Sequence, residues 1–160
     1  MGLRKVVLEG DEVLRKKSKE VKEVNGRILE LIDDMWETLD EYNGVGLAAP
    51  QVGVLRRIAV IDTGVEGERF VIINPEILEM SGSVEEDEGC LSLPGIVGKV
   101  IRPERIKVRA LGLDGESYTI DGEGLLAKAL SHEIDHLEGI LYVDKATDIR
   151  DIDDEEDSAE

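Results

Sequence analysis

The sequence has few of the features on which secreted and membrane proteins depend. Its 160 residues include a single cysteine, which excludes an internal disulfide and fits a reducing compartment. No apolar run approaches the roughly 20 residues that cross a bilayer, and the acidic Glu9 interrupts the first residues before a signal-peptide core can form. We therefore expect a cytoplasmic protein with no membrane partner.

Basic and aromatic residues are also scarce. Lys and Arg number 19 against 37 Asp and Glu, so the formal net charge is -18, and such a surface repels phosphates and anionic lipid. Nucleic acid is therefore excluded as an expected partner. One Trp, three Tyr and one Phe leave the core to aliphatic side chains, and the length fits one globular domain.

The pattern of apolar residues predicts an α+β fold. A period of about 3.6 residues indicates an N-terminal helix over about 27–42 and a central helix over about 124–138. Because strands and helices do not alternate, we expect a single domain with antiparallel or mixed sheets packed around the central helix. The β-rich runs lie at residues 57–61, 70–73, 77–83, 105–111 and 117–120, and Asp114-Gly115 is the best hairpin turn.

Both histidines lie in the segment His-Glu-Ile-Asp-His at residues 132–136. At positions i and i+4 of a helix, the imidazoles of His132 and His136 project from one face and can ligate one metal ion, with Glu133 beside them. Catalytic metal sites usually take three protein ligands, and the soft thiolate of Cys90 is the candidate third. The competing interpretations are a solvated helix face for the histidines and a small buried apolar role for the cysteine.

The segment Gly-Val-Gly-Leu-Ala-Ala-Pro-Gln at residues 44–51 is also unusual. Its two glycines allow close backbone approach, and Pro50 stiffens a turn that presents Gln51. The segment lacks the third glycine of a dinucleotide fingerprint and the Gly-Lys-Ser/Thr of a P-loop. Phosphate binding is therefore not supported.

Together these segments resemble the peptide deformylase family, whose members remove the formyl group from the initiator methionine of nascent chains. Residues 44–51, 88–92 (Glu-Gly-Cys-Leu-Ser) and 132–136 match its three motifs in order. The resemblance implies one divalent metal ion held by Cys90, His132 and His136. It favours Fe²⁺, with Zn²⁺, Ni²⁺ or Co²⁺ able to substitute.

The resemblance also implies a reaction and a substrate. Glu133 would be the general base toward a water molecule, and Gln51 and the backbone N–H of Leu91 would stabilise the oxyanion. The partners would be N-formylmethionyl peptides, bound as an added strand, with an aliphatic pocket for the methionine side chain. The substrate-binding residues would be Gly44, Val45, Gly46, Gly89, Leu125 and Ala129.

Several charged residues carry further expectations. Glu86 and Lys128 stand where relatives are often apolar at the rim of this pocket, and we expect them to pair across its mouth. Asp135 is expected to pair with Arg102. The acidic run at residues 85–88 is expected to favour metal retention and to disfavour acidic peptides.

The C-terminal end limits the analogy. Residues 151–160 hold seven acids and no base, which is typical of a solvated, disordered terminus. After Val143 we expect about one helical stretch, anchored by Ile149 and Ile152. We assign 1–147 to the catalytic domain and 148–160 to an acidic, partly disordered tail, which makes ribosome docking through this tail doubtful. We expect a monomer.

Two rival functions remain. A His-Glu-x-x-His zinc peptidase shares the histidine motif but usually takes a later His or Glu as third ligand. No histidine follows His136, and Glu138 is too close along the helix. A non-catalytic protein that keeps the metal as structure would need neither a general base nor an open coordination position.

Overall fold

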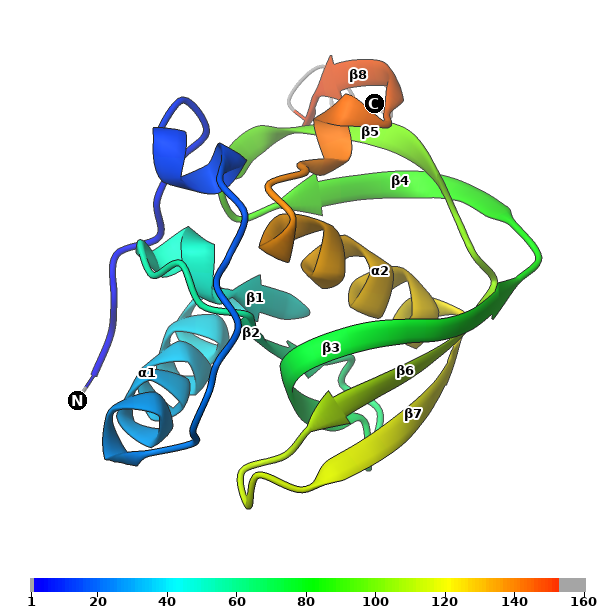
Figure 1. The fold of residues 1–160 in the computed structure, drawn as a ribbon. Helices are drawn as coiled ribbons and strands as arrows, with labels where there is room; N and C mark the ends of the chain where they lie inside the picture. Colours follow the sequence, from blue (N-terminus) through cyan, green and yellow to red (C-terminus); the bar gives the residue numbers. More distant parts are fainter. Residues whose placement is uncertain (1, 153–160) are drawn as a thin grey trace.

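The computed structural model describes residues 2–152 and shows an α+β domain, as predicted (Figure 1). The helices are α1 (Gly26–Tyr42) and α2 (Leu125–Leu137), with short 3-10 helices η1 (Glu12–Arg15), η2 (Ala49–Val52) and η3 (Tyr142–Asp144). The strands are β1 (Gly46–Ala48), β2 (Ile58–Asp62), β3 (Arg69–Ser81), β4 (Val84–Cys90), β5 (Leu93–Arg102), β6 (Arg105–Leu111), β7 (Ser117–Glu123) and β8 (Thr147–Asp151).

The strands form two antiparallel sheets. One has five strands in the order β1-β2-β3-β6-β7, and the other has three in the order β4-β5-β8. Figure 1 shows α2 between the two sheets, with α1 beside β1 and β2. In these strand orders β1 and β4 are edge strands.

Both helices follow their sequence signals closely. The Asn25 side chain accepts a hydrogen bond of 3.1 Å from the N–H of Ile28 and caps α1, and Asn43 ends the helix in the left-handed region at φ 52°. On α2 the stripe that faces the large sheet is buried among aliphatic side chains. It consists of Leu126, Leu130, Ile134 and Leu137.

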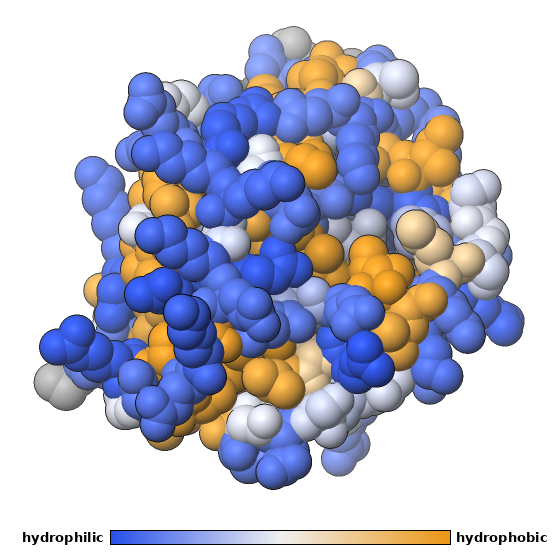
Figure 2. All heavy atoms as spheres, in the orientation of Figure 1, coloured by the Kyte–Doolittle hydropathy of each residue, from blue (hydrophilic) through white to orange (hydrophobic). Residues whose placement is uncertain are grey.

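The core is mostly aliphatic and the visible face of the molecule is mostly polar. Figure 2 shows a face dominated by hydrophilic residues, with apolar side chains in small separate groups. Tyr142 is the one aromatic among the largest fully buried side chains of the described residues, and the other members are aliphatic. In the part of the chain that the structure describes, no helix has the length and apolarity to cross a bilayer.

The expected set of strands divided one strand in two and omitted others. The segment Asn74-Pro75 was expected to separate two runs, but β3 continues through it with a register shift between Ile73 and Glu76. Asn74 has φ 51°, so the irregularity is absorbed as a bulge within one strand. Strands β1, β4 and β5 were absent from the expected runs, and in β4 the exposed acids hide the alternation.

From Thr147 to Asp151 the chain forms a strand instead of the helical stretch expected after Val143, whereas Ile152, the last described residue, is helical. The chain forms η3 and then β8, which pairs with β5 at Ile96 and Asp151. This segment forms a strand because β5 has an open edge with which it can pair. No signal within residues 144–152 indicates that edge. The described structure thus includes residues 148–152 of the expected tail at 148–160, and residues 153–160 lie outside the described residues.

Gly139, just after α2, supports a prediction about stability. It has φ 79°, and a Cβ there would lie 2.5 Å from the carbonyl oxygen of Arg15. We expect Gly139→Ala to lower the free energy of unfolding by roughly 2–4 kcal/mol, since a left-handed residue costs about 1–2 kcal/mol and the backbone clash adds to it. Urea unfolding measures the change.

Gly64→Ala is the matched control for this substitution. Gly64 has φ 88°, and nothing lies within 4 Å of its added Cβ, so only the conformational cost of about 1–2 kcal/mol applies. Equal destabilisation of the two variants would show that the contact with Arg15 is not tight.

Candidate active site

Helix α2 places three candidate residues side by side. His132, Glu133 and His136 are 9%, 3% and 1% exposed. The Nε2 atoms of the two histidines lie 3.2 Å apart, as their spacing of one helical turn predicts. The solvated helix face considered for the histidines is therefore wrong.

Cys90 reaches the same point from the end of β4. Its Sγ lies 3.4 Å from His136 Nε2, and the ligand atoms of Cys90, His132 and His136 all lie within 4.8 Å of one another. Metal–nitrogen bonds of about 2.1 Å and metal–sulfur bonds of about 2.3 Å place tetrahedral ligands about 3.3–3.6 Å apart. The trio fits one metal ion.

Glu88 orients the ring of His132. A carboxylate oxygen of Glu88 lies 2.8 Å from His132 Nδ1, so Nε2 is turned toward Cys90. Burial alone would raise the pKa of Glu88, but the hydrogen bonds and charges of His132 and Arg102 lower it to about 2. Glu88 therefore stays ionised, although it is only 4% exposed.

Arg102 connects the two sides of the site. Its guanidinium donates to both oxygens of Glu88, at 2.7 and 3.0 Å, and to Asp135 at 2.7 Å. The predicted pair of Arg102 and Asp135 is therefore present, and Lys145 reaches the same carboxylate at 2.9 Å. The partner of Glu88, which sequence reasoning did not name, is the same arginine.

Removing Arg102 should strongly destabilise the protein. Arg102→Met leaves two carboxylates without their main counter-charge, and we expect the free energy of unfolding at pH 7 to fall by about 3–5 kcal/mol. The matched control is Arg105→Met, whose pair with Glu123 is exposed and should contribute at most about 1 kcal/mol. Chemical denaturation of both variants measures the difference.

The same variant has an expected pH dependence. Because the pKa of Glu88 is lowered from 4.5 to about 2, its contribution to stability is complete above pH 4.5 and is lost as the pH falls toward 2. The difference in free energy of unfolding between wild type and Arg102→Met should therefore become smaller below pH 4.5. A difference that stays constant down to pH 2 would contradict the pairing.

Glu133 lies against the backbone of β1. A Cβ at Gly46 would lie 2.5 Å from Glu133 Oε2, so only glycine lets the strand approach this closely. Burial raises the pKa of Glu133 to about 7. Its Oε1 is buried without a hydrogen-bond partner among residues 2–152, which leaves this oxygen available to a bound molecule.

Gln51 is held from the opposite side of the site. It is 1% exposed, and its Oε1 accepts the N–H of Ala48 at 2.9 Å. Its Nε2 donates to Ser92 Oγ at 3.1 Å and lies 3.4 Å from Cys90 Sγ. The amide N–H₂ is therefore fixed toward the cysteine, and Leu91 follows the cysteine at the pocket wall.

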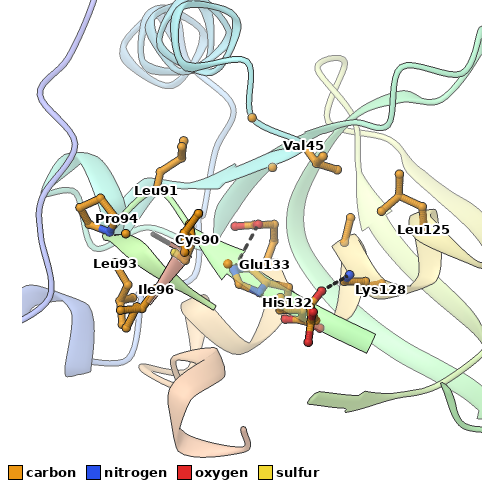
Figure 3. A pocket seen from close by; sticks show the side chains of 18 residues that line it. Val45, Cys90, Leu91, Leu93, Pro94, Ile96, Leu125, Lys128, His132 and Glu133 are labelled. Carbon is orange, nitrogen blue, oxygen red and sulfur yellow. Dashed lines mark hydrogen bonds and ion pairs between the residues drawn. The ribbon is translucent and has the colours of Figure 1, made fainter. Parts of the chain in front are cut away.

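These groups open into a pocket of about 350 Å³ between the free edges of β1 and β4. In Figure 3 Val45, Leu125 and Lys128 lie at one end, Leu93, Pro94 and Ile96 at the other, and Cys90, His132 and Glu133 between them. Every residue proposed to bind substrate lines this pocket, namely Gly44, Val45, Gly46, Gly89, Leu125 and Ala129. Gln51 and His136 lie behind the wall rather than on it.

The charges at the pocket rim are paired. Lys128 Nζ lies 3.5 Å from Glu86 Oε2, so the predicted ion pair is present, and it also donates to the carbonyl of Asp87 at 2.7 Å. Asp87 in turn pairs with Arg150 of β8 at 2.5 Å. The acidic run of β4 is therefore largely neutralised by neighbouring cations.

Sequence reasoning missed the apolar end of the pocket. Leu93, Pro94, Ile96 and Ile152 line it, but none belonged to the expected site. Leu93, Pro94 and Ile96 come directly after the motif around Cys90, and this proximity in sequence was the signal that could have identified them. Ile152 had none, because it adjoins the acidic run and reaches the pocket only through the pairing of β8.

The fold and the site define an α+β domain with a candidate Cys-His-His metal centre beside a buried carboxylate. A family model described as polypeptide deformylase matches residues 3–151. The peptide deformylase of Agathobacter rectalis is 57% identical over 145 residues, covering 91% of this chain and 90% of that protein. This chain therefore belongs to the polypeptide deformylase family and is an enzyme of that family.

Solved structures agree with this assignment. A peptide deformylase from Legionella pneumophila is 47% identical, with a TM-score of 0.87 over 91% of this chain and 87% of that chain. A peptide deformylase from Ehrlichia chaffeensis in complex with actinonin is 40% identical, with a TM-score of 0.87 over 92% of this chain and 91% of that chain.

Proposed function

We propose that this enzyme removes the N-formyl group from the initiator methionine of nascent polypeptides and releases formate. One observation carries the proposal: Glu133 is buried next to the Cys90, His132 and His136 trio, at the centre of a pocket bounded by two free strand edges. This arrangement combines a base, a metal centre and a place for an extended peptide.

Cys90, His132 and His136 would hold one divalent metal ion. Such an ion supplies Lewis-acid chemistry, which polarises a carbonyl group and makes water more acidic. One sulfur and two nitrogen ligands are compatible with Zn²⁺, Fe²⁺, Co²⁺ or Ni²⁺. We propose Fe²⁺ on the family resemblance, which predicts activity that is sensitive to air. Equal activity and equal air stability of the zinc and iron forms would contradict this choice.

Glu133 would move the proton during hydrolysis. It accepts a proton from the attacking water, whose oxygen bonds to the formyl carbon, and returns it to the amine nitrogen as the C–N bond breaks. The products are formate and a free N-terminus. A pKa near 7 suits a group that must both accept and release a proton.

Two donors would stabilise the oxyanion that develops on the formyl oxygen. Gln51 Nε2 is fixed toward Cys90 by its contacts with Ala48 and Ser92, and the backbone N–H of Leu91 adjoins the same cysteine. Because these groups are held before the substrate arrives, they stabilise charge without reorganising.

The substrate would bind as an extended strand between β1 and β4. Both strands are sheet edges, and the pocket is lined by Gly46 of β1, by Gly44 and Val45 just before it, and by Gly89 of β4. The methionine side chain would enter the end lined by Val45, Leu125 and Ala129.

The His-Glu-x-x-His zinc peptidase is not favoured. Such peptidases take their third ligand downstream, whereas here Cys90 Sγ already lies 3.4 Å from His136 Nε2. A purely structural metal site is disfavoured as well, because it needs neither the buried Glu133 nor the open pocket.

The acidic run of β4 gives less electrostatic selection than its sequence suggests. Glu86, Asp87 and Glu88 have cationic partners in Lys128, Arg150 and Arg102 respectively. A preference for basic over acidic formyl-peptides stays a prediction, and we expect it to be small and to disappear at high salt. We also propose a cytoplasmic monomer that meets its substrates without docking through the C-terminal tail.

The test is anaerobic purification with metal analysis, followed by incubation with formyl-Met-Ala-Ser and the unblocked Met-Ala-Ser. We expect about one metal ion per chain, formate from the first peptide and no cleavage of the second. Free amino acids without formate would identify a peptidase instead.

A further inference from the structure

The first residues of the described chain connect α1 with two segments of the candidate site. In Figure 1 they run from the side of α1, past η2, to the turn between β4 and β5. Residues 2–8 form neither helix nor strand, so contacts with other elements hold them in place. We call residues 2–9 the N-terminal strap.

One end of the N-terminal strap is anchored on α1 by Asp34. The carboxylate of Asp34 accepts the N–H of Gly2 at 2.8 Å and the guanidinium of Arg4, with Nε at 3.0 Å and Nη2 at 2.9 Å. The backbone N–H of Arg4 donates to Thr38 Oγ1 at 3.0 Å, one helical turn further along α1. Asp34 is only 4% exposed, and a buried carboxylate is costly without such partners, so this anchor is fixed.

The other end joins the two segments that carry the proposed oxyanion donors. The N–H of Val7 donates to the carbonyl of Gln51 at 2.7 Å, and the N–H of Glu9 donates to the carbonyl of Ser92 at 2.7 Å. Gln51 supplies the side-chain donor, and Ser92 directly follows Leu91, whose N–H is the second donor. Since a single residue separates the two donating positions of the strap, the strap sets the spacing between these segments.

Gln51 and Ser92 are therefore joined on two sides. Their side chains meet through the hydrogen bond of 3.1 Å between Gln51 Nε2 and Ser92 Oγ, and the N-terminal strap links their backbones. Both residues are buried. Because donors to an oxyanion act through fixed positions, a shift of one segment against the other weakens transition-state stabilisation.

We propose that Asp34 is a positioning residue for hydrolysis, which acts through the N-terminal strap on the Gln51 amide and the N–H of Leu91. The inference rests on the proposed function, which assigns these two donors to the oxyanion. Asp34 neither lines the pocket nor belongs to the candidate metal trio. Its loss therefore affects kcat, while KM and the bound metal stay close to those of the wild type.

The test compares Asp34→Ala with Asp33→Ala in formate release from formyl-Met-Ala-Ser. Asp33 is the matched control because it carries the same charge on the preceding residue of α1 but is exposed. We expect Asp34→Ala to lower kcat about tenfold, with KM and metal content within about twofold of wild type. Asp33→Ala should keep kcat within about twofold of wild type, as is usual for an exposed substitution.

Val7→Pro tests the strap without touching its anchor. Proline has no N–H, so this variant loses the hydrogen bond to the Gln51 carbonyl but keeps an apolar side chain. We expect the same pattern as in Asp34→Ala, a lower kcat with a nearly unchanged KM. All assays are made at a temperature at which thermal unfolding shows the variant to be folded.

A double-mutant cycle separates positioning from general loosening of the fold. In Gln51→Ala the side-chain donor is already absent, so adding Asp34→Ala should lower kcat by less than about threefold. A substitution that only loosens the fold would lower kcat by the same factor in both backgrounds. The cycle therefore measures whether Asp34 acts through Gln51.

Three results would overturn the inference: an unchanged kcat in both Asp34→Ala and Val7→Pro, an equal loss in Asp33→Ala, or the same loss in the presence and absence of Gln51. A fall in activity that follows a loss of metal would also contradict it. Failure of the proposed function looks different, because the wild type itself would then release no formate.

Discussion

Glu133→Gln is expected to lower kcat for formate release by about 1000-fold or more while the bound metal stays at the wild-type amount. The amide has nearly the shape of the carboxylate but cannot accept a proton, and general acid–base groups typically contribute 10²–10⁴-fold. Since Glu133 is not one of the three proposed ligands, its loss should separate catalysis from metal binding. Formate assays and elemental analysis of the same preparation measure both.

The matched control is Glu138→Gln. Glu138 follows α2 and pairs with Arg57 at 2.6 Å, outside the pocket. We expect its kcat to stay within threefold of wild type. Retention of more than a tenth of the wild-type kcat in Glu133→Gln would show that another group moves the proton.

Cys90→Ala is the substitution expected to affect the metal itself. It removes the only sulfur ligand of the proposed trio and leaves two imidazoles from a single helix. We expect metal content to fall below about one tenth of an ion per chain, and activity to fall by about 1000-fold or more. Elemental analysis after gel filtration, together with formate release, checks both effects.

Two further measurements make the Cys90 prediction specific. In cobalt-loaded wild type a thiolate ligand should give a near-ultraviolet charge-transfer band, which Cys90→Ala should lack. Ser92→Ala, two residues away, removes a hydrogen-bond partner of Gln51 but no proposed ligand, so its metal content should be normal. A full complement of metal in Cys90→Ala would contradict the assignment of the ligands.

Local signals predicted the elements that depend on local physics. The helical period and the Asn25 cap predicted α1 within one or two residues, and Asp114-Gly115 predicted the hairpin that joins β6 to β7. In each case one short segment contains both the signal and the interaction that it forms.

The errors occurred where distant segments pair. The break expected at Asn74-Pro75 is overridden because neighbouring strands hold both halves of β3 in one sheet. Strand β8 exists because β5 offers an open edge, and the acids beside it suggested a solvated tail instead. Propensity is a weak guide when tertiary contacts supply the backbone hydrogen bonds.

The sequence by itself determined the chemistry of the candidate site. Two histidines one turn apart, with a glutamate between them, are carried by a single helix, and the motif around Cys90 supplies the remaining donor type. The resemblance of three motifs to one family added the reaction, and the comparisons confirm the family. These features need no knowledge of how the sheets pack.

Only the tertiary structure decided how these groups act together. The 3.4 Å approach of Cys90 to His136, the Glu88–Arg102–Asp135 contacts and the place of Ile152 in the pocket all join segments that are distant in sequence. Such contacts depend on strand pairing and on burial of α2 between two sheets, so they form only when the whole chain folds. The physical reason is that side-chain type is encoded residue by residue, whereas distance and burial are properties of the packed domain.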